Sequence, residues 1–191
     1  MNHRLARLAL VAAVASSTAV LATGAPASAD DRTCRGTIGR TTVDGSVIVP
    51  SGETCTLNGT RVKGDVKSYR GSRLELNDAH VIGNVQTERS ARTMVRNSTF
   101  VGGDVQNKYG GTHTVKFSRV DGNIQHEEAN GVSYVRRNVV DGDVQLYKNP
   151  GGFSVWNNRI DGNLQCFENG SPRSGDGNIV QGVKQGQCKG R

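Results

Sequence analysis

Three aspartates stand 20 residues apart, each directly before a glycine: Asp121, Asp141 and Asp161. In a repeat protein, residues at one period fall in one column, so these carboxylates would form an acidic stripe. The stripe offers oxygen ligands to a hard cation such as calcium, although no single loop supplies a complete ligand set. The alternative is Asp-Gly turn chemistry on a solvated edge, with Arg119 and Arg159 nearby in sequence to offset the charge. Both interpretations stay open at this point.

A second set of side chains is suited to binding. Tyr147 and Phe167 occupy equivalent places one repeat apart, while Lys116, Arg136 and Trp156 share one column. Aromatic and basic side chains on a flat surface can dock a polysaccharide or an anionic wall polymer, which we expect as partners. The alternative is that Trp156 covers the edge of the core and the others are scattered over the surface.

The chain contains no motif that assigns a catalytic reaction, neither a nucleophile elbow nor a zinc or nucleotide signature. Only His126, beside Glu127 and Glu128, forms a local polar cluster, which we expect in a solvated loop. We therefore expect a non-enzymatic structural or binding module without a cofactor. The alternative is a polysaccharide lyase or hydrolase that uses the aspartate column with calcium.

The four cysteines, Cys34, Cys55, Cys166 and Cys188, are an even number, as expected for disulfides in an oxidising compartment. Three pairings are possible. The separations of 21 and 22 residues are each about one repeat, which brings the partners within disulfide range. We therefore pair Cys34 with Cys55 and Cys166 with Cys188, one bridge at each end of the repeat array. A zinc site is not expected, because no C-x-x-C spacing exists.

A regular repeat has to position all these residues. Glycines recur at gaps of 19 or 20 residues, at Gly45, Gly64, Gly83, Gly103, Gly122, Gly142, Gly162 and Gly182. The phrase around them, apolar-x-Gly-Asp/Asn-apolar-Gln, gives short strands that alternate inward and outward. One unit cannot bury its apolar face alone, so the units must stack. The sequence predicts an all-β fold, a right-handed parallel β-helix (solenoid) of about eight coils of 19–20 residues.

Equivalent residues of successive coils stack into columns. The column after the glycine alternates acid and amide: Asp65, Asn84, Asp104, Asn123, Asp143 and Asn163. The column three past the glycine is a row of amides: Gln86, Gln106, Gln125, Gln145 and Gln165. Alternation separates the carboxylates and lets each Asn amide donate to a neighbouring one, so both columns are expected to be structural ladders.

The core pattern varies along the chain. An inward apolar pair precedes each phrase, as Phe153 with Val155 and, more weakly, Val115 with Phe117. In the last phrase, Lys184 fills the inward apolar slot. The core is therefore expected to end there, at a capped C-terminal coil.

Residues 1–29 have the pattern of a secretory signal: arginines, an apolar run over 8–22 and an A-x-A site at 27–29. An uncleaved anchor is the alternative, but the run is short for a membrane span. Cleavage would leave a secreted single domain, 30–191, with no membrane span. The segment holds two arginines and no acid, so the charge falls from +7 to +5. That charge is mixed with acids, which argues against nucleic acid as a partner.

The C-terminal 30 residues carry a resemblance. The run 161–166, with Gly175, Gly182 and the ending 185–188, resembles the tail of a group of small secreted bacterial proteins. The resemblance implies a right-handed β-helix similar in fold to pectate lyases, with no assigned activity and no catalytic residues carried over. The Gly-Asp-Val phrases also resemble bactofilins, which polymerise end to end. The signal and the cysteines count against that family, so a monomer is expected.

Overall fold

The computed structural model describes residues 30–191, and the expected signal segment lies outside that range. The described chain forms 25 short strands in three parallel sheets. Sheet A consists of β1 (Arg32–Thr33), β4 (Val47–Val49), β7 (Val66–Ser68), β10 (Val85–Glu88), β13 (Val105–Lys108), β16 (Ile124–Glu127), β19 (Val144–Tyr147), β22 (Leu164–Phe167) and β25 (Lys184–Gly186).

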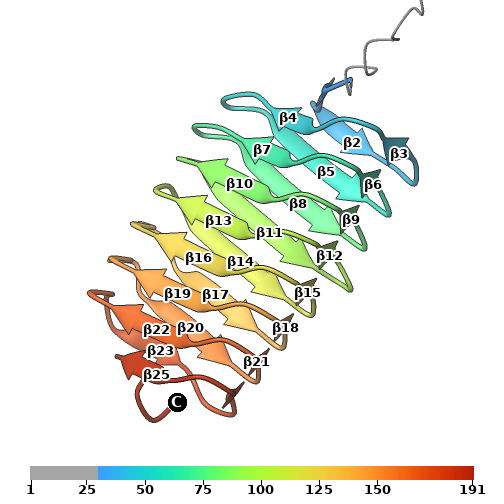
Figure 1. Ribbon diagram of the computed structural model, residues 1–191. Coiled ribbons are helices and arrows are strands. Elements are labelled where there is room, and N and C mark those ends of the chain that lie inside the picture. Colours follow the sequence, from blue (N-terminus) through green and yellow to red (C-terminus); the bar gives the residue numbers. More distant parts are fainter. Residues whose placement is uncertain (1–29) are drawn as a thin grey trace, which may run out of the picture.

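Sheet B consists of β2 (Gly36–Ile38), β5 (Thr54–Asn58), β8 (Arg73–Asn77), β11 (Arg92–Arg96), β14 (Thr112–Lys116), β17 (Ser133–Arg136), β20 (Phe153–Trp156) and β23 (Pro172–Ser174). Sheet C consists of β3 (Thr42–Val43), β6 (Arg61–Val62), β9 (His80–Val81), β12 (Phe100–Val101), β15 (Arg119–Val120), β18 (Val139–Val140), β21 (Arg159–Ile160) and β24 (Ile179–Val180). Each strand pairs in parallel with the strand three further along the chain, so successive coils lie side by side along a rod (Figure 1).

These pairings confirm the predicted parallel β-solenoid of about eight turns. The two-residue alternation of each strand turns one side chain inward and the next outward. In sheet A the first inward position is apolar in seven successive strands: Val47, Val66, Val85, Val105, Ile124, Val144 and Leu164, all fully buried. This column, together with the buried apolar columns of sheets B and C, forms the continuous core that no single coil could bury.

The acid–amide column is a ladder, as predicted. The Nδ2 of Asn123 donates to Oδ1 of Asp104 at 3.1 Å. The same carboxylate oxygen accepts the backbone N–H of Asn123 at 2.7 Å, and Oδ1 of Asn123 in turn accepts the backbone N–H of Asp143 at 2.7 Å. The side chains therefore satisfy the turn backbone of the next coil, which the sequence analysis did not anticipate.

This ladder explains the repeated glycine. A Cβ on Gly142 would lie 2.5 Å from Oδ1 of Asn123 and 2.7 Å from the carbonyl oxygen of Gly122. These distances are shorter than van der Waals contact. A side chain at this position would therefore displace the ladder residue and the backbone of the preceding coil. The glycine is thus required by close approach between coils, not by an unusual backbone angle.

A second, buried ladder was missed. Asn138, Asn158 and Asn178 stand 20 residues apart, each directly before a strand of sheet C. Each of the three is at most 6% exposed. The Nδ2 of Asn158 donates to the carbonyl of Val135 at 2.9 Å and to Oδ1 of Asn178 at 2.9 Å. Their 20-residue spacing was the signal that could have revealed them.

Both ends of the rod carry the predicted disulfides. Cys34–Cys55 joins Cα atoms 5.6 Å apart, and Cys166–Cys188 joins Cα atoms 5.3 Å apart. Each links neighbouring coils, and together they fit an oxidising environment. The C-terminal cap is confirmed as well, because Lys184 pairs in register with Leu164 and its Nζ donates to the carbonyl of Asn178 at 2.9 Å.

Two expectations about the core were wrong. His126 is not in a solvated loop: it lies on β16 and is fully buried, because strand alternation turns Gln125 and Glu127 outward and His126 inward. Phe117 is not the inward partner of Val115. That partner is His113, whereas Phe117 follows the strand at a φ of 51° and is 45% exposed.

In the middle coils, one inward column of sheet A and one of sheet B are therefore polar. Asn107 pairs in register with His126 on sheet A, and His113 pairs with Ser133 on sheet B. Within 30–191, five buried side-chain atoms lack a hydrogen-bond partner, and all belong to these four residues. Burial lowers the pKa of His113 to about 4 and holds the pKa of His126 well below its usual value, so both imidazoles are neutral at pH 7.

Candidate functional site

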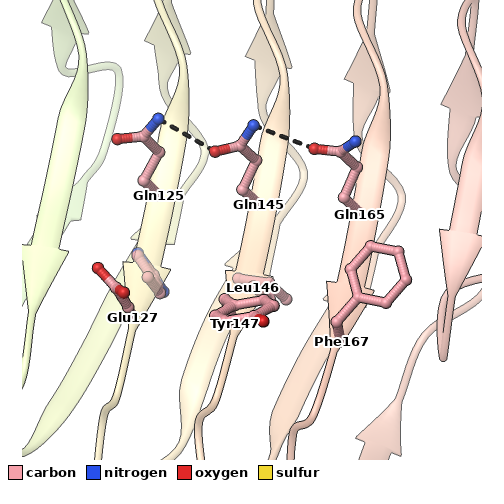
Figure 2. Close-up of a pocket in the computed structure, with 8 residues that line it drawn as sticks. Gln125, Glu127, Gln145, Leu146, Tyr147, Gln165 and Phe167 are labelled. Atoms are coloured by element: carbon pink, nitrogen blue, oxygen red, sulfur yellow. Dashed lines mark hydrogen bonds between the residues drawn. The ribbon is translucent and has the colours of Figure 1, made fainter.

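The outward face of sheet A carries the predicted glutamine ladder. Each Nε2 donates to Oε1 of the glutamine in the next coil, at 3.0–3.1 Å, from Gln86 through Gln106, Gln125, Gln145 and Gln165 to Gln185. Figure 2 shows three of these side chains in a row, joined by two of the bonds. The ladder extends one coil further than predicted, to Gln185.

The ladder does not exhaust the hydrogen-bonding capacity of the amides. A primary amide has two N–H groups and two oxygen lone pairs, and the ladder uses one of each. One N–H and one lone pair per coil thus stay available, except at Gln106, whose Nε2 also contacts Oδ2 of Asp104 at 3.3 Å. Neighbouring rungs are spaced by about 4.8 Å, the distance between strands in a sheet.

The glutamines line a trough. Two adjoining hollows, of about 390 and 400 Å³, share Gln125 and Glu127 and together run from Lys67 to Phe167. Its other lining side chains follow one column beside the glutamines: Glu88, Lys108, Glu127, Tyr147 and Phe167, with Tyr69 at one end. The trough therefore spans six coils of the rod.

Charges in the trough alternate in sign. Glu88, Lys108 and Glu127 are neighbours in register on three successive strands. The Nζ of Lys108 lies 3.4 Å from Oε2 of Glu127, and this carboxylate raises the pKa of Lys108. The trough thus neutralises its own charges and presents amides and aromatic rings.

Tyr147 and Phe167 lie one coil apart in register, as predicted. Their ring centroids are 6.5 Å apart, edge to face, and the side chains are 37% and 38% exposed. The hydroxyl of Tyr147 donates to Glu168 at 3.0 Å, which fixes the ring at the edge of the trough. Figure 2 shows both rings beside the glutamine ladder.

Lys116, Arg136 and Trp156 also form the predicted column, but on sheet B. The five candidate binding residues therefore belong to two surfaces, and Trp156 does not lie with Tyr147 and Phe167. The guanidinium of Arg136 lies 4.6 Å from the ring centroid of Tyr134 and 5.7 Å from that of Trp156.

The aspartate column lies on sheet C, directly after β15, β18 and β21. Arg119 contacts two of its members: Nε lies 2.8 Å from Asp121, and Nη2 lies 2.5 Å from Asp141. Arg159 is 3.7 Å from Asp161. Across 30–191, no three His, Cys, Asp or Glu side chains cluster closely enough to hold a metal ion. The aspartate column is thus an edge of the rod at which the carboxylates form ion pairs with arginines.

Comparison with protein-family models, curated proteins and solved structures finds no match to this chain. The resemblance to secreted bacterial β-helices and pectate lyases, and the right-handed sense expected with it, stay predictions. No helix long and apolar enough to cross a membrane occurs in the described part of the chain.

Proposed function

We propose that this protein is an exported, non-enzymatic binding module that holds an extended polysaccharide in the trough of sheet A. The observation that carries the proposal is the trough itself, in which five of the six coils repeat the same amide at the same height and the first carries Lys67. Hydroxyl groups of a sugar chain both donate and accept, which suits a surface offering one N–H and one lone pair per coil.

The aromatic side chains add affinity at the ends. Tyr69, Tyr147 and Phe167 are 41%, 37% and 38% exposed, so their faces and edges can contact the apolar faces of sugar rings. Five coil-to-coil steps give a trough length of about 24 Å. Affinity should therefore rise with oligosaccharide length and level off once the chain fills the trough.

The test is calorimetric titration of residues 30–191 with neutral β-linked oligosaccharides of glucose and of N-acetylglucosamine, from dimer to octamer. Tyr147→Ala and Phe167→Ala should each weaken binding by about threefold to tenfold, the usual worth of an aromatic contact. Gln145→Leu removes a rung and should also weaken it. Ile82→Ala is the control, since Ile82 is 45% exposed and follows β9 of sheet C, away from the trough.

Absence of binding across the series, or equal weakening by Ile82→Ala, would contradict the proposal. Calcium-dependent cleavage of an acidic polysaccharide, lost in Asp141→Asn, would replace it with a calcium-assisted lyase or hydrolase. The contacts of Arg119 with Asp121 and Asp141 speak for an ion-paired edge instead.

A further inference from the structure

The outward face of sheet B is basic. From β5 to β20 its strands carry five basic residues, Arg73, Arg92, Arg96, Lys116 and Arg136, and a single acid, Glu75. Over the matching stretch of sheet A, from β7 to β22, two lysines face two glutamates. Over this stretch, the strands of sheet B are therefore more basic than those of sheet A.

The strand register places like charges beside each other on this face. Arg73 and Arg92 are direct neighbours, and so are Lys116 and Arg136. Like charges in adjacent register positions destabilise a sheet unless a counter-charge lies between them. None of these four residues takes part in an ion pair within the described chain, where Glu75 is paired with Arg96.

One of these basic groups, the guanidinium of Arg136, is also held in place. Nε and Nη2 of Arg136 donate to the hydroxyl of Ser154 at 3.1 and 2.9 Å, while Tyr134 and Trp156 flank the guanidinium. Arg137 lies over Trp156 at 4.8 Å. A hollow of about 130 Å³ lies beside the Arg73–Arg92 pair. Guanidinium groups fixed in this way lose little freedom when they bind a carboxylate.

We propose that sheet B is a second binding face, which takes an extended polysaccharide bearing a carboxylate on successive sugars. The two cations of each pair stand about 4.8 Å apart along the rod, so a chain that follows the rod meets them in succession. The disulfides fit an oxidising, extracellular setting, in which an extended polysaccharide can reach this face. This face is independent of the sheet A trough, so one rod can join a neutral and an acidic polymer.

The experiment is titration of residues 30–191 with polygalacturonate, at low and at physiological salt. Arg73→Gln/Arg92→Gln and Lys116→Gln/Arg136→Gln should each weaken binding about tenfold or more, because each pair supplies charge-assisted hydrogen bonds. Arg61→Gln/Lys63→Gln, which removes the same charge at sheet C, is the matched control. Tyr147→Ala/Phe167→Ala should leave polygalacturonate binding unchanged, which separates this face from the trough.

Four results overturn the proposal: no binding of polygalacturonate, equal loss in the sheet C control, equal binding of fully methyl-esterified polygalacturonan, or tighter binding of single-stranded DNA. Any of the first three results would show that sheet B does not bind the carboxylates of the polymer. Tighter binding of single-stranded DNA would assign the face to a different polyanion. Circular dichroism and thermal unfolding of each variant confirm that the rod is folded, since all the substituted side chains point outward.

Discussion

Sheets A and B are built from the same coils, yet charged residues that are neighbours in register have opposite signs on the outer face of sheet A and like signs on that of sheet B. On sheet A, register alternates Glu88, Lys108 and Glu127, so each charge is offset by its neighbour. On sheet B, register stacks Arg73 on Arg92 and Lys116 on Arg136. In a solenoid, equivalent residues of successive coils are neighbours. The order of charges along the axis therefore decides whether a face compensates its own charges or has charges left for a ligand of opposite sign.

The largest expected effect concerns a feature beneath both faces, the two buried histidines of the middle coils. His113 and His126 are neutral when folded, whereas the unfolded chain protonates them near their ordinary pKa of 6.5. The contribution of these neutral histidines to the free energy of unfolding is therefore fully present above about pH 6.5, and it decreases as the pH falls toward 4. The lowered pKa of His113 alone corresponds to about 3 kcal/mol. Glu127 flanks His126 on β16 but faces outward.

Denaturant unfolding between pH 4 and pH 8 measures this fall. His126→Leu should flatten the curve, because Leu146 already fills the same column one coil further. Acid should weaken both faces together, since their middle coils enclose the same histidines. A stability that is constant down to pH 4 would show that the two imidazoles are not held neutral inside the rod.

The next effect separates the faces. Reversing charge with Arg92→Glu/Lys116→Glu should weaken polygalacturonate binding by about 100-fold, the loss of one charge contact at each site. Binding of neutral oligosaccharides in the trough should not change. A parallel loss of both ligands would mean that one face, not two, does the binding.

The smallest effect tests the register rule without any ligand. Arg92→Glu converts the Arg73–Arg92 stack into an opposite pair and should raise stability by up to ~1 kcal/mol. Lys108→Glu creates three stacked glutamates on sheet A and should lower stability. Thermal unfolding at low salt, repeated at 1 M salt, should show both changes shrink with screening. Changes of the same sign in the two variants would refute the comparison.

Much of this molecule could be predicted from its repeat. The glycine period, the two ladders and the one-coil cysteine separations follow from the rule that equivalent residues stack, so the fold and the disulfides were within reach of the sequence. The inward His126 was not, because a histidine beside Glu127 and Glu128 resembles a solvated cluster unless the strand phase is known. The candidate binding residues were placed in the right columns but assigned to one surface. Only the sheet pairing shows that Trp156 and Tyr147 belong to different faces.

The glutamine ladder has one more consequence. All five of its bonds run the same way, with the N-terminal coil donating and the C-terminal coil accepting. Amide dipoles aligned head to tail add up, so the trough has a polarity from one end of the rod to the other. A sugar chain has a polarity too, from its reducing to its non-reducing end. The trough should therefore bind a sugar chain in one orientation, with its reducing end always toward the same end of the rod.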